Sequence, residues 1–237
     1  MRPRSRQAAL SPLSSIAMLQ KLESLVLELY HEADRVVAAY RHRTALCCPV
    51  GCLQCCFSEK IEATVLEMVP VAFQLFRTNQ AELVIKRLEK TAPSRQCILL
   101  RADLLATGGQ GCSQYPHRAL VCRLFGFAGN LDRHGVPRLA RCRHMGPEQE
   151  AGSRNPDSVD NENVMPLFQR FGVTLTAIHP GLGTVRRPIN EALLEALSKV
   201  GLLLELQRAA PEDDGPVEQP PESPPTPHQP TLRKKAA

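Results

Sequence analysis

Five of the chain's nine cysteines fall within ten residues, in the run CCPVGCLQCC at positions 47–56. Metal ligation explains this density, because thiolates are strong ligands for zinc and iron and a two-residue gap lets two sulfurs reach one ion from a single turn. Cys52 and Cys55 have that spacing, and Pro49 and Gly51 favour the turn. The run therefore predicts a metal site.

Catalysis and core packing are the alternative roles for these thiols. A catalytic thiol pair also uses the spacing of Cys52 and Cys55, but it leaves the remaining cysteines without a role. Buried structural cysteines are scattered among large apolar residues, whereas this run is polar and contains proline and glycine. Of the three roles, metal ligation best accounts for the density of thiols.

The adjacent pair Cys55 and Cys56 carries geometric information. Neighbouring side chains of an extended segment point to opposite sides, so we expect one of the two to serve a different metal or a different atom of a cluster. Without Cys47, eight cysteines remain, which is the number that two four-thiolate sites require.

Positive charge accompanies the later cysteines. Between positions 91 and 146 the acidic residues are Asp103 and Asp132. The arginines there are Arg95, Arg101, Arg118, Arg123, Arg133, Arg138, Arg141 and Arg143. We expect them to donate hydrogen bonds to anionic sulfur and to offset thiolate charge. A nucleic-acid surface is the competing interpretation, but the stretch lacks interleaved aromatic residues and a known binding motif.

The elements that must position these residues are mostly helices. Apolar residues in steps of three and four predict a helix of about seven turns. They are Leu19, Leu22, Val26, Leu29, Ala33, Val36 and Tyr40. Glu23 lies off this stripe and is expected to face water. Periodicity predicts further helices over 59–77, which Pro70 should kink or divide, and over Gln80–Lys90 with Leu83 among its apolar positions.

The second half of the chain is less regular. Positions 97–145 read as loops with short extended pieces at Leu120–Phe127 and Pro137–Ala140, the latter in a hairpin turning at Asp132–Gly135. A last helix follows Pro188, with Asn190 as its cap. The predicted fold class is mainly α, with helices framing an irregular cysteine-rich metal-binding module and a few short strands.

Composition divides the chain into three parts. We expect a basic flexible arm at 1–12, a single helical domain at 13–208 that contains the cysteine module at about 45–145, and a disordered Pro-rich tail at 209–237. Positions 146–163 should form a surface loop. The Pro-x-x-Pro stretches of the tail offer a docking segment for a proline-reading protein partner.

The expected cellular compartment follows from two sequence patterns, those of a signal peptide and of a membrane span. The basic start has no signal-peptide pattern, because Gln20, Lys21 and Glu23 interrupt its apolar stretch. No window of about 18 apolar residues predicts a membrane span. We therefore expect a cytoplasmic protein without membrane contact, in which a reducing environment favours metal binding over disulfides.

At these residues the chain resembles the YkgJ-type cysteine-cluster family, the CxxCxxCC proteins described as zinc- or iron-chelating. The resemblance covers roughly 45–145 and rests on C-PVG-C-LQ-CC at 48–56 and on CSQYPHRALVCRLFGF at 112–127. It implies Tyr115, Arg118 and Arg123 as supporting residues. It also implies a ligand set of Cys48, Cys52, Cys55, Cys56, Cys97, Cys112, Cys122 and Cys142. Cys47 is an alternative first ligand, and His144 could replace one of the later thiolates.

Three functions are compatible with these observations. The first is a metal-binding protein that chelates zinc or iron, the iron either as an ion or in an iron-sulfur cluster. The second is a metal-dependent protein-modifying enzyme, because the family is compared with flagellin lysine N-methylases, which would add S-adenosylmethionine as a co-substrate. The third is a basic nucleic-acid-binding module, for which the net charge of +5 gives modest support. The sequence alone decides neither the metal, nor the number of centres, nor whether the protein is an enzyme.

Overall fold

The computed structural model describes residues 12–44, 46–49, 52–90, 96–107, 111–145 and 165–209. The predicted arm, surface loop and Pro-rich tail lie outside these ranges, apart from residues 12 and 209, which belong to helices. The fold is mainly helical with four short strands among the described residues, as predicted. No helix in the described ranges is both long and apolar enough to cross a membrane.

Helix α1 (Pro12–Thr44) confirms the first predicted helix, and its apolar stripe is buried. Val37 rather than Val36 completes the stripe, because Val37 is buried and Val36 is only partly so. The expectation for Glu23 was wrong. Its side chain is 6% exposed and forms a two-fold ion pair with Arg77, at 2.6 Å for each oxygen, which compensates the buried charge.

Helix α3 (Val65–Arg77) begins later than the predicted 59–77. Residues Glu62–Thr64 form strand β1 instead, and Thr64 with Glu67 makes a capping box that starts the helix at Val65. Pro70 lies inside α3 and does not divide it, so of the two expected effects of this proline, division is excluded. Strand β1 pairs antiparallel with β4 (Arg186–Pro188), which immediately precedes α8 (Ile189–Ala209).

Four helices bury the main core. Helix α3 contacts both α1 and α8, and α6 (Phe168–Ile178), which the sequence analysis did not predict, packs on α1. The short α7 (Pro180–Gly183) follows α6. Helix α4 (Ala81–Lys90) was predicted and lies against α8, but Leu83 is 60% exposed rather than buried.

The cysteine-bearing segments are mostly irregular. They include the one-turn α2 (Gln54–Phe57), the 3₁₀ turns Ala102–Thr107 and Tyr115–His117, and α5 (Leu120–Leu124). The extended segment predicted at Leu120–Phe127 is thus wrong, because a helical turn forms there. The predicted hairpin is confirmed: β2 (Gly129–Leu131) pairs with β3 (Pro137–Leu139), turning at Asp132–Gly135.

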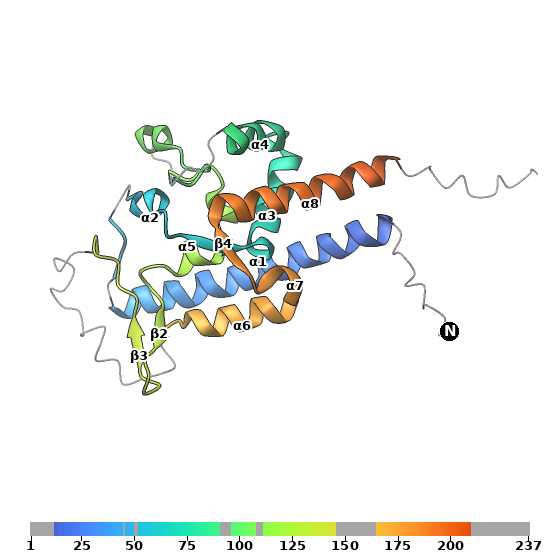
Figure 1. Cartoon of the computed structure of the whole chain (residues 1–237). Helices are drawn as coiled ribbons and strands as arrows, with labels where there is room; N and C mark the ends of the chain where they lie inside the picture. The colour runs from blue at the N-terminus through green and yellow to red at the C-terminus, as the bar shows by residue number, and fades with distance from the viewer. Residues whose placement is uncertain are drawn as a thin grey trace, which may run out of the picture.

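These elements give the molecule two ends (Figure 1). The start of α1 and the end of α8 lie at one end, and α2, α5 and the β2–β3 hairpin lie toward the other. The long helices therefore act as a frame on which the cysteine-bearing segments are held.

Candidate metal centre

One cavity of about 630 Å³ gathers the predicted ligands. All eight cysteines of the predicted set line it, namely Cys48, Cys52, Cys55, Cys56, Cys97, Cys112, Cys122 and Cys142. Cys47, the alternative first ligand, is not among its lining residues, and neither is His144. None of the nine cysteines forms a disulfide. Thiols spread over about 95 positions of sequence thus face a common space.

The end of α1 and the one-turn α2 position the first four thiols. Thr44 caps the end of α1 by donating its hydroxyl to the carbonyl of Tyr40, at 2.8 Å. Cys48 follows in the next segment and is exposed. The backbone N–H of Cys52 donates to the carbonyl of Pro49, at 3.1 Å, and Gly51, predicted to favour a turn here, lies outside the described residues.

The adjacent cysteines lie in a helical turn rather than in an extended segment. Cys55 and Cys56 both belong to α2, so their side chains diverge by about 100° instead of 180°. The expectation of opposite directions was therefore too strong. A hydrogen bond joins the two thiol groups.

Backbone contacts position the next two thiols, Cys97 and Cys112. The N–H of Cys97 donates to the carbonyl of Cys56, at 3.0 Å, and an isolated antiparallel bridge joins Leu100 to Cys112. Asn190 links the segment that carries Cys97 to α8. Its side chain accepts a hydrogen bond from the N–H of Ile98 and donates one to the carbonyl of residue 96. Asn190 therefore does not cap α8, which begins one residue earlier.

Helix α5 carries Cys122, and a buried carboxylate supports it. Glu67 is 0% exposed, and its side chain accepts hydrogen bonds from the N–H of Thr64 and the N–H of Val121. Burial raises the pKa of Glu67 above its usual range. One carboxyl group thus connects the start of α3 with the first turn of α5.

The last thiol approaches the turn that follows α5. Gly126 has a φ of +85°, and a Cβ placed on it would lie 2.8 Å from Cε of Met145 and 3.4 Å from Cβ of Cys142. Only glycine permits both this backbone conformation and this close approach. The turn therefore holds Cys142 near the segment that carries Cys122.

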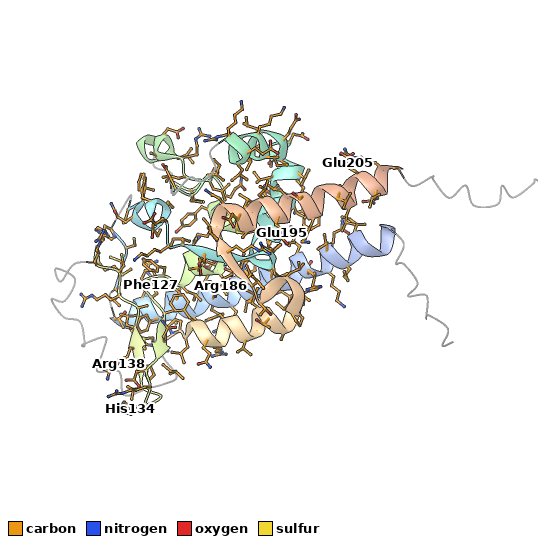
Figure 2. The ribbon with its side chains drawn as sticks, viewed as in Figure 1. Phe127, His134, Arg138, Arg186, Glu195 and Glu205 are labelled. Atoms are coloured by element: carbon orange, nitrogen blue, oxygen red, sulfur yellow. The ribbon has the colours of Figure 1, made fainter. Side chains whose placement is uncertain are left out.

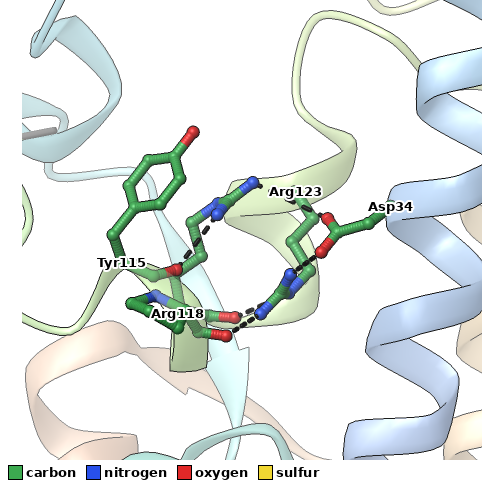
Figure 3. A network of polar contacts seen from close by, with 5 residues as sticks. Asp34, Tyr115, Arg118 and Arg123 are labelled. Carbon is green, nitrogen blue, oxygen red and sulfur yellow. Dashed lines mark hydrogen bonds and ion pairs between the residues drawn. The ribbon is translucent and has the colours of Figure 1, made fainter.

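Two arginines and one carboxylate form a charged wall of the cavity (Figure 3). Arg123 is 4% exposed; it forms an ion pair with Asp34 of α1 and donates to the carbonyl of Arg118, at 3.1 Å. Its guanidinium lies 4.4 Å from the ring centroid of Tyr30. Arg118 lies over Tyr115, at 3.9 Å from the ring centroid, and pairs more loosely with Asp34, at 3.7 Å.

The remaining arginines of that region are placed differently from the expectation. Arg95 lies outside the described residues, and of the other seven between positions 91 and 146, Arg118 and Arg123 line the cavity. Arg138 pairs with Asp132 on the β2–β3 hairpin, where Figure 2 shows it beside His134. Arg101 pairs with the exposed Asp103. For Arg101 and Arg138, the expected role beside the sulfurs is therefore wrong.

The thiols differ in their acidity. Burial raises the pKa of Cys97 to about 12 and that of Cys122 well above its usual range. Burial likewise raises the pKa of Cys112. The hydrogen bond with Cys56 lowers the pKa of Cys55 and raises that of Cys56. Of this adjacent pair, Cys55 is thus the thiol that ionises more readily.

The donor set fits zinc or iron in its chemistry, while its geometry is not that of a coordination sphere. Eight thiols, beside arginines of which one is paired with the Asp34 carboxylate, match a thiophilic metal centre. Among the described residues, however, no three Cys, His, Asp or Glu side chains are grouped so that they could hold one ion. Coordination therefore requires the cysteine side chains to rotate toward a common point in the cavity.

Several residues of the site were not predicted. Asp34 and Arg41 on α1 line the cavity, and the guanidinium of Arg41 lies 5.5 Å from the ring centroid of Phe127. Their positions off the apolar stripe gave them the pattern of ordinary surface charges. Comparison of the chain with family models, with curated proteins and with solved structures finds no match, so the candidate site rests on its own residues.

Proposed function

We propose that the chain is a metal-binding protein that chelates zinc or iron through the thiolates around the cavity, the iron either as an ion or in an iron-sulfur cluster. One observation carries the proposal. Eight thiols from separate segments line one cavity, and the ninth cysteine, Cys47, does not. These eight are the ligand set that the resemblance to the YkgJ-type family implies, so membership of that family is part of the proposal.

Charge is the reason why a metal suits this cavity. Several of the thiols have raised pKa values because burial disfavours their ionised form. A bound cation reverses this preference, since it stabilises thiolates and releases their protons. Arg118 adds positive charge close to Cys55 and Cys112, whose pKa values it lowers as a secondary cause.

The absence of disulfides is consistent with a reducing compartment, so a cytoplasmic location belongs to the same proposal. A metal bound in the cavity would supply either a crosslink between the cysteine-bearing segments or redox activity. The residues around the cavity would hold it, orient it and offset its negative charge.

Elemental analysis of protein purified without oxygen tests the proposal. We expect stoichiometric zinc, or iron with inorganic sulfide and a broad visible absorption band. Cys55→Ser and Cys122→Ser should lose metal, and Cys47→Ser should retain it, because Cys47 is not among the residues that line the cavity. Equal metal content in all three variants, or none in the unmodified chain, contradicts the proposal.

A further inference from the structure

Positive charge without a carboxylate partner gathers at one end of the molecule. Arg41 and Arg43 are exposed on the last turn of α1, Arg133 is exposed at the turn of the β2–β3 hairpin, and Arg143 is exposed in the segment after β3. None of these four forms an ion pair with a carboxylate of the described residues. Arg133 and Arg143 instead donate to the ring of the histidine that follows each of them, at 2.9 and 3.1 Å.

Negative charge is nearly absent from the same segments. Asp132 is the single acidic residue in 41–57 and 111–145. Its carboxylate already accepts two backbone N–H groups of the hairpin turn, at 2.8 and 3.0 Å, and pairs with Arg138, at 3.2 Å. The segments therefore keep a positive potential that their own carboxylates do not offset.

Contacts between these segments place the arginines on one face. The guanidinium of Arg41 lies 5.5 Å from the ring centroid of Phe127, which stands just before β2. The turn at Gly126 lies against Cys142, and Arg143 is the next residue. Figure 1 likewise shows the last turn of α1 at the same end of the molecule as the β2–β3 hairpin.

Exposed aromatic rings accompany this positive charge. Among the described residues, the exposed aromatic side chains are Phe57, Tyr115 and Phe125, all in cysteine-bearing segments. Tyr115 lies flat beside the guanidinium of Arg118, at 3.9 Å from the ring centroid. Phe125 directly precedes the turn that approaches Cys142. The interleaving of aromatic rings with arginines, which the linear pattern lacks, is thus produced by the fold.

This combination of groups fits an unpaired nucleic-acid strand. Arginines bind phosphates, and aromatic rings stack on bases, whose faces are open in a single strand. An acidic peptide or an anionic membrane would use the arginines and leave the stacking rings without a role. A duplex keeps its base faces inside its own stack, where these rings do not reach them.

We infer that this basic face binds single-stranded nucleic acid. The face is formed by Arg41, Arg43, Tyr115, Phe125, Arg133 and Arg143. The inference goes beyond the proposed function. Arg43, Arg133 and Arg143 are not among the residues that line the cavity, so the arginines of the face can be tested without changing the candidate metal centre.

Fluorescence anisotropy of a labelled oligothymidylate of about 20 nucleotides, titrated with the reduced full-length chain, tests the inference. We expect binding at about 50 mM salt that weakens as salt rises. Arg43→Ala with Arg143→Ala should weaken binding and reduce the slope of log affinity against log salt by about 1.4, because two phosphate contacts of about 0.7 each are lost.

Lys86→Ala with Lys199→Ala is the matched control. It removes the same charge from α4 and α8, where each lysine pairs with a glutamate of its own helix. This pair should leave the slope unchanged, and both double variants should keep the metal content of the unmodified chain. An equal reduction of the slope in the two double variants overturns the inference.

Phe125→Leu tests stacking, since it keeps an apolar side chain and removes the ring. We expect affinity to fall about fivefold or more, with the salt slope unchanged. Metal content is measured on the same sample, because Phe125 lines the cavity. Unchanged affinity for the oligonucleotide in this variant overturns the inference.

Three further results with the unmodified chain also overturn it. They are no binding of the oligonucleotide at about 50 mM salt, tighter binding of a duplex of the same length, and binding of phosphatidylserine vesicles without binding of the oligonucleotide. Each of them leaves the proposed function intact, because metal content is measured separately.

Discussion

Arg123 is permanently charged but only 4% exposed. Its hydrogen-bond acceptors must therefore compensate for the burial of its charge. The Asp34 carboxylate and the carbonyl of Arg118 accept its hydrogen bonds. Arg123→Ala leaves these acceptors without their donor, and we expect a loss of about 2–3 kcal/mol in the free energy of unfolding, measured with urea. Arg123→Lys should lose part of this, because an ammonium cannot reproduce the guanidinium fork.

Arg138 offers the matched control. Its ion pair with Asp132 is exposed, with the arginine side chain 66% accessible, so Arg138→Ala should change the unfolding free energy by less than about 1 kcal/mol. Equal effects at the two arginines would mean that burial of Arg123 does not determine its contribution.

Glu67 gives the stability of the fold a pH dependence of defined sign. Burial raises its pKa in the folded chain above the reference value of 4.5, so the folded state binds the proton more tightly than the unfolded state. The stability that this group contributes is therefore present below pH 4.5 and is lost as the pH rises through the folded pKa. Relative to Glu67→Gln, the unmodified chain should lose unfolding free energy as the pH rises from about 4 to about 7.

Urea unfolding of both proteins across this range measures the difference. Because the two chains share all cysteines, effects of thiol protonation cancel in the comparison. Glu82→Gln is the control of opposite sign, since the hydrogen bond from Lys86 lowers the pKa of Glu82. A difference between the unmodified chain and Glu67→Gln that does not change with pH contradicts this assignment.

A residue of the site could be predicted from the sequence where its amino-acid type is unusual among its neighbours. Clustered cysteines stand out in any sequence, and all eight selected thiols line the cavity. Asp34 and Arg41 were not predictable, because a charged residue beside an apolar stripe is usually solvated. Only the folded chain brings the end of α1 against the segments that carry Cys122 and Phe127.

At the scale of elements, the turn after α5 should control the position of Cys142. Gly126→Ala incurs the cost of a positive φ and places a methyl group 2.8 Å from Met145, near Cys142. Gly135→Ala also has a positive φ, +78°, but its methyl group would meet nothing within 4 Å. We expect about 1 kcal/mol of destabilisation from Gly135→Ala, more from Gly126→Ala, and zinc loss from Gly126→Ala alone.

Chemical denaturation and elemental analysis of the two variants provide the measurement. Their difference isolates the contact with Met145 and Cys142 from the backbone cost that both share. If both variants keep their zinc and lose equal stability, the turn does not position Cys142 for a metal.

Element prediction succeeded where one periodic pattern dominates. The stripes of α1 and α8 are long, and both helices are confirmed. Helix α5 was misread as extended, because its five residues are too few to display a helical period. The start of α3 was misplaced because strand β1 depends on pairing with β4, more than a hundred positions away in the chain.

For the whole molecule, the helical core and the cysteine module should respond differently to metal removal. Helix α1 contacts α3, α6 and α8, and α3 contacts α8, around apolar residues such as Val26 and Ala33 of α1, both 0% exposed. With a chelator, we expect hydrogen exchange to increase at 46–49, 52–57, 96–101 and 111–119, while these four helices stay protected. Mass spectrometry of peptides resolves the two regions.

Far-UV circular dichroism on the same samples should show that most helicity remains after chelation. Rapid exchange throughout α1 and α8 on chelation would mean that the core depends on the metal. Unchanged exchange in all segments would mean that no metal stabilises the module.

Thiol protection mapped by alkylation tests the central claim most directly. On native, anaerobic protein, we expect Cys47 to react and the eight cavity thiols to be protected, including Cys48, whose exposure alone would leave it reactive. A chelator should make Cys48 and its seven partners reactive. Rapid alkylation of Cys48 before chelation, or protection of the cavity thiols that persists after it, would contradict a metal held by these eight cysteines.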